Sequence, residues 1–450
     1  MSTQQINRKI NLLQATSINM IDMVGIGPFV VMPFVVAQFN NGLFLWAWIF
    51  GAVAALIDAM IWSELGAAYP LAGGTYNFHR IAFGKKGGRL MSFLFVWQTS
   101  IQAPLVVASA AIGFAQYLSY IVELSFWQQK IVSGGLVLFV CFLLYRKIEA
   151  VGKISVLLWS IVILTVLWII ISGLTHQQHP IPLLPKGNES FFSYAFWIAI
   201  GHGSVKTIYS YLGYYNVCHL GGEIKNPQKN IPRSIFISIA GIGTLYLLMN
   251  VSIMGVVNWQ LVKADDRYLV SSFMEQLHGH TAGVVVTILI LWIAMASLFA
   301  IVLGYSRVPY AAAVDGNFFK MFSKLHPTKN FPYVSLLVLC GLGFIFSLLM
   351  KLTETISSIL AMRIIVQFIA QAVGVVLLRK RFGSKKLPFK MWLFPIPVIV
   401  SIGIWIFVFA NTGWFALWGS LIAMAGLVVY LIMNRVDAER QWRREDSSKS

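Results

Sequence analysis

The chain has 450 residues, of which 58% are hydrophobic and only 11% are charged, and its formal net charge is +18 at pH 7. This balance excludes a soluble globular domain, because such domains carry about 25% charged residues. The basic excess alone would also fit a nucleic-acid-binding protein, so the positions of the basic residues have to decide between that class and a membrane protein.

Long apolar runs predict twelve membrane spans. A helix needs about 20 apolar residues to cross the hydrocarbon core of a bilayer. The runs at 10–57 and 391–434 are long enough for two helices each, and each contains an Asn- and Gly-bearing turn signal. Single spans are expected near 90–122, 131–145, 154–173, 191–222, 234–260, 281–306, 333–350 and 355–378. The fold class is therefore an all-α integral membrane protein.

The basic residues follow the topology of these spans. If the amino terminus is cytoplasmic, 27 of the 34 lysines and arginines fall on inner loops and tails, and five fall on outer loops. This bias is the positive-inside rule, so we expect tails 1–14 and 435–450 to face the cytoplasm. The predicted location is the plasma (inner) membrane, with the lipid bilayer as a partner and no role for nucleic acid.

Metal, cofactor and enzyme chemistry have no candidate residues in the sequence. Three cysteines lie in apolar segments, and eight histidines are scattered without an acidic partner at helical spacing. No cleavage site follows the first apolar segment, which is expected to stay in the mature protein. We predict no metal, no cofactor and no enzymatic activity.

Glycine clusters interrupt two spans at corresponding positions. Gly25-Ile26-Gly27-Pro28 breaks span one, and Tyr211-Leu212-Gly213 breaks span six. Hydrocarbon cannot hydrogen-bond freed backbone groups, so such breaks persist only where they line a cavity or a binding site. Gly25 and Gly213 are five spans apart, and five is an odd number, so the second unit is inverted. We predict repeats at 15–173 and 174–380, followed by a two-helix hairpin at 381–434.

Three sequence blocks resemble the amino acid–polyamine–organocation superfamily, in the right order and spacing over roughly residues 15–380. The blocks read Glu64-Leu65-Gly66-Ala67-Ala68-Tyr69-Pro70-Leu71-Ala72-Gly73-Gly74-Thr75-Tyr76, then Glu223-Ile224-Lys225-Asn226-Pro227 with Asn230-Ile231-Pro232-Arg233, and finally Ser306-Arg307-Val308-Pro309-Tyr310-Ala311 with Asp315-Gly316. The resemblance implies the LeuT-type fold, a 5+5 inverted repeat with broken helices one and six, and amino acid transport by alternating access.

The same resemblance implies a substrate site at the two breaks. The half-helix after the first break offers N–H groups and a positive dipole end to a substrate carboxylate, and the half-helix before the second break offers carbonyls to an ammonium group. The substrate-binding residues expected are Gly25, Ile26, Gly27, Tyr209, Ser210, Tyr211 and Gly213. The chain departs from the family at Ile26, where a serine is frequent, and at Pro28, which removes one N–H donor.

Gating and coupling roles are expected at three residues. Tyr209 matches the aromatic gate of the family. Ser297 matches a position that helps bind sodium in coupled relatives, and Lys153 matches a lysine that replaces sodium in sodium-independent members. Lys153 would also give a route to proton coupling. The simpler alternatives are a positive-inside loop lysine and a serine bonded to a carbonyl one turn back.

Three further ionisable residues lie within spans. Lys206 and Arg363 are expected in the outer halves of their spans, either lining a cationic vestibule or snorkelling to the outer surface. Asp58 is expected to be a buried acid paired with a hydroxyl or a lysine, with a proton relay as its alternative.

The sequence thus predicts a sodium-independent permease or exchanger for amino acids. Acidic residues are scarce in the spans, with only Asp58 and Glu64 noted in or near span two, and this favours neutral substrates. A polyamine or organic-amine antiporter of the same superfamily is the alternative within transporters. A membrane receptor or scaffold is the alternative from another class.

Overall fold

The computed structural model describes residues 8–71, 73–145, 151–185, 190–329, 331–383 and 387–447. In these ranges every element is helical, and the sole β-type contact is an isolated bridge between Ile10 and Ile224. The longer elements are α1 (Leu12–Met23), α2 (Gly27–Val36), α3 (Leu45–Ala68), α4 (Thr75–Ala82), α5 (Gly84–Leu118), α6 (Phe126–Leu144), α7 (Val151–Leu174), α8 (Tyr194–Tyr211), α10 (Pro227–Met254), α11 (Leu269–His278), α12 (His280–Tyr305), α13 (Arg307–Val314), α14 (Tyr333–Leu349), α15 (Leu352–Arg363), α16 (Ala370–Phe382), α17 (Ile396–Ala410) and α18 (Trp414–Ser447).

Short helical turns complete the chain: α9 (Asn216–His219), η1 (Gly221–Glu223), η2 (Trp259–Leu261), η3 (Lys320–Ser323) and the π-helix η4 (Ile364–Ile369). The π-helix continues α15 directly into α16. Single π turns inside α-helices occur frequently at functional sites.

Seven helices of the described chain are long and apolar enough to cross a membrane, and they become eight when α1 and α2 count as one broken span. The two halves of that span are bent by 48°. Part of α7 (Trp159–Leu174), α14 and α17 are apolar but shorter. A helical membrane protein with several spans is therefore confirmed, whereas the number twelve stays a prediction.

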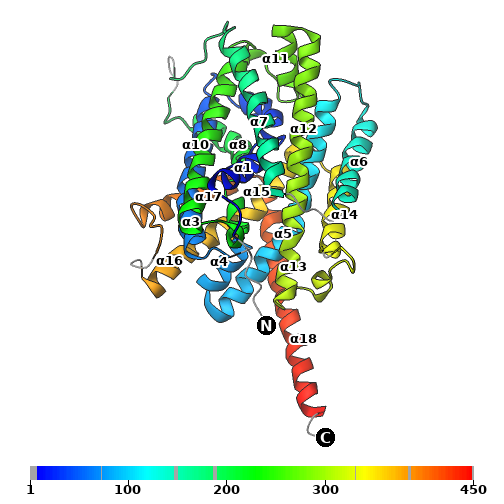
Figure 1. Ribbon diagram of the computed structural model, residues 1–450. Coiled ribbons are helices and arrows are strands. Elements are labelled where there is room, and N and C mark those ends of the chain that lie inside the picture. The colour runs from blue at the N-terminus through cyan, green and yellow to red at the C-terminus, as the bar shows by residue number, and fades with distance from the viewer. Residues whose placement is uncertain are drawn as a thin grey trace.

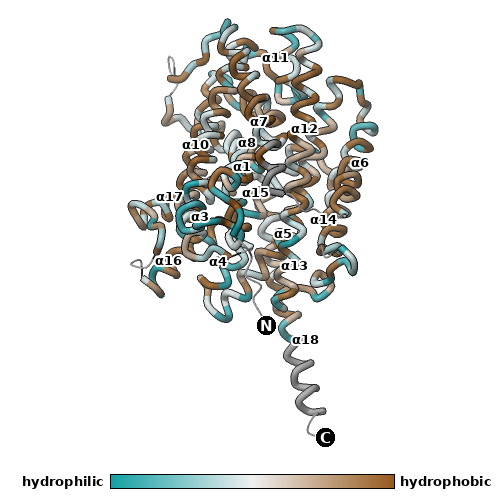
Figure 2. Tube along the Cα trace, viewed as in Figure 1, coloured by the Kyte–Doolittle hydropathy of each residue, from teal (hydrophilic) through white to brown (hydrophobic). Residues whose placement is uncertain are grey.

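The helices run side by side along one axis, with α11 at one end of the bundle and α4 and α13 at the other, where α18 projects beyond the rest (Figure 1). Hydrophilic residues gather toward the two ends (Figure 2). Large apolar side chains face outward in between, among them Phe139, Leu164, Trp292 and Trp418. An apolar outer surface of this kind needs lipid around it.

Helix packing places α1, α2 and α8 inside the bundle. Helix α3 packs against α8 and α10, and α5 packs against α12, α14 and α15. Close approach of α3 to α8 depends on Gly51, because a Cβ there would lie 2.8 Å from Thr207 Oγ1 and 3.0 Å from the Tyr211 ring. Small residues at such crossings let membrane helices pack tightly.

Ion pairs join the helices at the α4 and α13 end. Arg379 holds Glu64 with two hydrogen bonds of 2.7 and 2.5 Å, and Arg80 lies 2.5 Å from Asp315. Glu64 and Asp315 belong to the sequence blocks described above, so these blocks connect segments 315 and 235 residues apart. Beyond the last block, α18 continues as a helix past residue 435, where the sequence predicted the start of a tail.

Candidate functional site

The break between α1 and α2 exposes backbone donors. Helix α1 ends at Met23, and α2 begins at Gly27 with Pro28 in its first turn. The N–H groups of Gly25 and Ile26 donate no hydrogen bond to any part of the chain that the structure describes. Gly27 has no acceptor one turn back, because it is the first residue of its helix. The positive dipole end of α2 adds to these free donors.

The break after α8 exposes backbone acceptors. Helix α8 ends at Tyr211, and Gly213 turns the chain with φ +118°, a conformation that side chains disfavour. In the described residues, the carbonyls of Tyr211 and Leu212 accept no hydrogen bond. The two breaks therefore present complementary groups: N–H donors from one and carbonyl acceptors from the other.

The two breaks are in contact with each other. A Cβ on Gly213 would lie 2.8 Å from the backbone carbon of Asp22 and 2.8 Å from the nitrogen of Met23. The Tyr246 hydroxyl of α10 lies 2.8 Å from the Met23 carbonyl and 3.1 Å from the Ser210 carbonyl. Gly213 is thus required for close approach, and Tyr246 connects the ends of α1 and α8.

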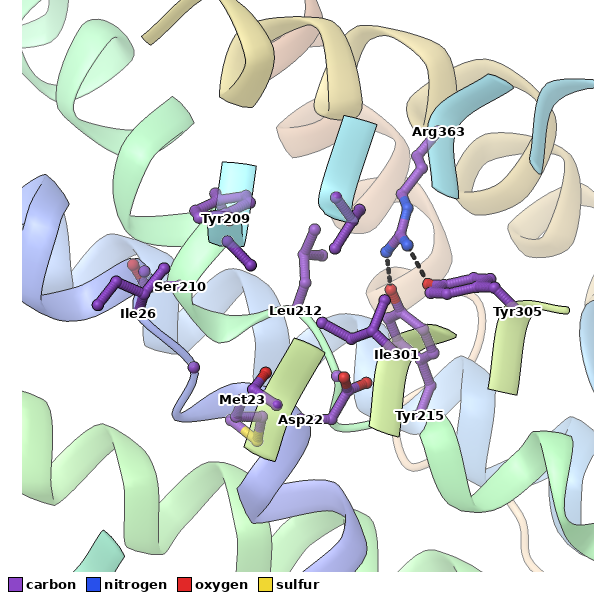
Figure 3. Close-up of a pocket in the computed structure, with 16 residues that line it drawn as sticks. Asp22, Met23, Ile26, Tyr209, Ser210, Leu212, Tyr215, Ile301, Tyr305 and Arg363 are labelled. Atoms are coloured by element: carbon purple, nitrogen blue, oxygen red, sulfur yellow. Dashed lines mark hydrogen bonds between the residues drawn. The ribbon is translucent and has the colours of Figure 1, made fainter. Parts of the chain in front are cut away.

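A central cavity of about 50 Å³ lies where the breaks meet (Figure 3). This volume has room for a few water molecules, so an amino acid would require the cavity to widen. Seven of the nine residues predicted for binding, gating or coupling line it: Gly25, Ile26, Gly27, Tyr209, Ser210, Gly213 and Ser297.

Tyr209 and Ser297 lie against the glycines of the first break. A Cβ on Gly27 would meet the Tyr209 ring at 3.1 Å, and a Cβ on Gly25 would meet Ser297 Oγ at 2.8 Å. The Tyr209 hydroxyl is 2.8 Å from Ser109 Oγ on α5, which fixes the ring over the start of α2. The glycines leave the space that these side chains occupy.

The other two predicted residues are placed differently. The Tyr211 side chain is fully buried away from the cavity, donates to the Trp48 carbonyl at 3.3 Å and packs on Tyr246. The Lys153 side chain lies outside the described residues, although the backbone there belongs to α7.

Arg363 lines the central cavity, whereas the sequence analysis offered an outer vestibule or the outer surface for it. Its side chain is 3% exposed at the end of α15, and its guanidinium donates to the hydroxyls of Tyr215 and Tyr305 (Figure 3). Of the two alternatives for Arg363, snorkelling to the outer surface is wrong, because the side chain is buried in the bundle and hydrogen-bonded to these two hydroxyls. Its Nε has no hydrogen-bond partner among the described residues.

Asp22, the single acidic residue of α1, also lines the cavity and was missed in the sequence. The run 10–57 contains this one acid, three residues before the first glycine of the break. An isolated acid in an apolar span is by default a functional candidate. That signal would have found it, and the sequence analysis, which named only Asp58 and Glu64, overlooked Asp22.

The other intramembrane residues have structural partners. Asp58 accepts hydrogen bonds from Tyr214 at 2.5 Å and from Trp62 at 2.8 Å, which confirms a buried acid paired with a hydroxyl. Lys206 donates to the Thr353 carbonyl at 3.1 Å and to Ser357 Oγ at 3.2 Å, so it joins α8 to α15. Neither residue lines the central cavity.

A second cavity of about 160 Å³ adjoins the first on the side of α4 and α13. Both cavities are lined by the same four residues, Asp22, Tyr215, Ile301 and Tyr305. Gly73, Tyr76, His219 and Arg307 are among the residues that line only the second cavity. The four residues that line both cavities (Asp22, Tyr215, Ile301 and Tyr305) form the partition between the central cavity and one end of the bundle.

A multi-pass membrane protein with a cavity at a broken span has the architecture of a transporter. The chain belongs to the amino acid permease family, whose model matches residues 10–434. It is 24% identical over 438 residues to the serine/threonine exchanger SteT of Bacillus subtilis (strain 168), covering 96% of this chain and 98% of that protein. It is 27% identical over 472 residues to the cystine/glutamate transporter of Pongo abelii, covering 99% and 89%.

A third relative is the uncharacterized amino acid permease YecA of Bacillus subtilis (strain 168), 27% identical over 350 residues that cover 77% of this chain and 78% of that protein. The region matched by the family model, residues 10–434, includes both helix breaks and all the sequence blocks that carried the resemblance. The chain is therefore a membrane transporter of amino acids and not an enzyme.

Proposed function

We propose that this permease moves net-neutral amino acids across the plasma membrane by alternating access. The observation that carries the proposal is the pairing of free N–H groups at Gly25 and Ile26 with the free carbonyl of Leu212 around one cavity. An amino acid zwitterion needs donors for its carboxylate and acceptors for its ammonium group. Backbone groups at the two breaks supply both.

The charges of the cavity favour a net-neutral substrate. Asp22 and Arg363 are the acidic and the basic residue in its lining, and their formal charges sum to zero. A substrate with an unbalanced charge would leave that charge unpaired in a low-dielectric site, which is unfavourable. The relatives differ in the substrates their names state, a serine/threonine pair in one and cystine and glutamate in another, so the side chain accepted by this chain is left to experiment.

The topology proposed is the LeuT type, with twelve spans, inverted repeats at 15–173 and 174–380, and a hairpin at 381–434. In support, α1 and α2 form a bent pair, α8 ends at a comparable break, and α2 packs against α8. Both termini are proposed to be cytoplasmic, which places the α4 and α13 end inside. The partition formed by Asp22, Tyr215, Ile301 and Tyr305 then separates the substrate from the cytoplasm.

Access from the outer side is proposed to be controlled by Tyr209. Its ring lies over Gly27, and its hydroxyl is bonded to Ser109 of α5. Movement of α5 relative to α8 would break this bond and swing the ring. An aromatic side chain can open such a site at small entropic expense, since it has only two rotatable bonds.

Coupling is proposed to be independent of sodium. The Lys153 ammonium would occupy the sodium position between α1 and α12 near Ser297, which itself touches Gly25. Reversible protonation of Lys153 would then connect transport to the proton gradient.

The second candidate function is transport of a polyamine or another organic amine. One observation favours it: Asp22 supplies the acidic side chain that a cationic substrate requires. Uptake of a labelled amino acid panel and of polyamines into proteoliposomes decides between the two. Saturable uptake of neutral amino acids supports the proposal, and uptake restricted to amines overturns it.

A further inference from the structure

The three acidic side chains of α1 and α3 differ sharply in their partners. Asp58 accepts hydrogen bonds from Tyr214, Trp62 and Trp405, at 2.5, 2.8 and 3.2 Å. Glu64 accepts two from Arg379. For Asp22, by contrast, the described part of the chain provides no hydrogen-bond donor in range and no cation within 4.0 Å, and its half-buried side chain is open to the central cavity.

An unpaired carboxylate is unfavourable in this setting. Transfer of an isolated ionised carboxylate into a low-dielectric interior is so costly that buried acids are normally paired or hydrogen-bonded. The nearby cation, Arg363, acts on Asp22 only across the cavity and forms no ion pair with it, because its guanidinium is turned toward Tyr215 and Tyr305 (Figure 3). Asp22 therefore has acceptor capacity that the described protein groups leave unused.

The position of Asp22 would let its free carboxylate oxygens accept hydrogen bonds from a ligand. It lies between the two breaks, because Gly213 packs directly on its backbone. It also lines both the central cavity and the cavity on the α4 and α13 side. A ligand in the central cavity would thus be within reach of Asp22 while its carboxylate occupies the start of α2.

We propose that Asp22 is the anionic subsite that binds the ammonium group of the substrate. This rests on the proposed function and extends it, since the backbone carbonyls alone would offer only dipoles to a full positive charge. Charge-assisted hydrogen bonds are about twice as strong as neutral ones. When the substrate leaves, Arg363 is the cation that balances Asp22 across the cavity.

A calcium-like ion fits the same carboxylate poorly. Such an ion needs several oxygen ligands together, with carboxylates among them. Within the residues that the structure describes, no group of three or more His, Cys, Asp or Glu side chains is arranged to hold a metal. An ammonium group needs only one strong acceptor and a few carbonyls, which matches what the break provides.

The test compares Asp22→Asn with the wild type in detergent, using binding of a transported neutral amino acid and of its N-acetyl analogue, which lacks the ammonium charge. Asparagine has the same shape, and Asp22 has no hydrogen bonds to lose, so the variant is expected to fold. We expect about tenfold or greater loss of affinity for the free amino acid. The N-acetyl analogue should bind weakly and equally to both proteins.

Asp58→Asn is the matched control, because it removes the charge of a fully bonded acid outside the cavity. It should lower the melting temperature while leaving the affinity of the folded protein unchanged. Asp22→Glu should restore part of the affinity.

Equal affinity of the wild type and Asp22→Asn for the free amino acid would overturn the subsite. If the wild type binds only amines, and does so through Asp22, the proposed amino acid substrate falls while the subsite stands. If the wild type binds neither amino acids nor amines, both the proposed substrate and the Asp22 subsite are refuted.

Discussion

Substitution of Gly27 by valine tests the carboxylate site at the start of α2. The added Cβ would lie 3.1 Å from the Tyr209 ring and 3.6 Å from Ser210 Oγ, before the two further methyl groups are considered. The ring cannot retreat freely, since its hydroxyl is bonded to Ser109. The new side chain would therefore fill the space in front of the free N–H groups.

The expected effect follows from the hydrogen bonds lost. A hydrogen bond to a charged group contributes about 1.5–3 kcal/mol, so blocking two of them removes about 3 kcal/mol or more. This corresponds to roughly 100-fold weaker binding. Isothermal titration of purified protein with a transported amino acid measures it directly.

The matched control is Gly403→Val in α17, where an added Cβ meets nothing within 4 Å. Its affinity should equal that of the wild type. Both variants should keep a cooperative melting transition, which separates loss of binding from loss of folding. Wild-type affinity in a folded Gly27→Val protein would refute the carboxylate site and would move the substrate elsewhere in the bundle.

Three other predictions concern gating, stability and coupling. Tyr209→Ala should lower the turnover number more than the affinity, because the gate is lost while the backbone cradle remains; unchanged turnover in proteoliposomes would remove Tyr209 from the gate. Asp58→Asn should destabilise the protein by about 2 kcal/mol through its lost charge-assisted bonds, and an unchanged melting temperature would contradict the importance of the Tyr214 contact. Uptake by the wild type should be independent of sodium, and Lys153→Ala should abolish it. A fully active variant, or sodium-dependent uptake by the wild type, would refute the coupling role of Lys153.

The helix breaks were predictable because their signal is local. Glycine and proline inside an apolar run are incompatible with an uninterrupted helix, and the membrane gives such a break a single explanation. Gly25, Gly27 and Gly213 accordingly line one cavity. The number of spans is harder to obtain from local signals, since α8 contains Lys206 and two glycines and is not among the helices apolar enough to cross a membrane.

The side chains of the cavity were harder to predict because their roles depend on contacts distant in sequence. Arg363 is held by Tyr215 and Tyr305, which are 148 and 58 residues away. The position of Arg363 along α15 could not show that these two hydroxyls would accept hydrogen bonds from its guanidinium. Tyr211 shows the opposite error: it sits at the break, but helix rotation turns its ring onto Trp48 and away from the cavity.

Uptake in proteoliposomes tests the central claim most directly. Proteoliposomes that contain the purified protein are given labelled amino acids and polyamines in turn, with and without sodium and with and without a proton gradient. Proteoliposomes that contain the Gly27→Val variant are measured in parallel. The proposal predicts saturable uptake of neutral amino acids that needs no sodium and is lost in Gly27→Val. Uptake confined to polyamines, or amino acid uptake that survives in Gly27→Val, would contradict it.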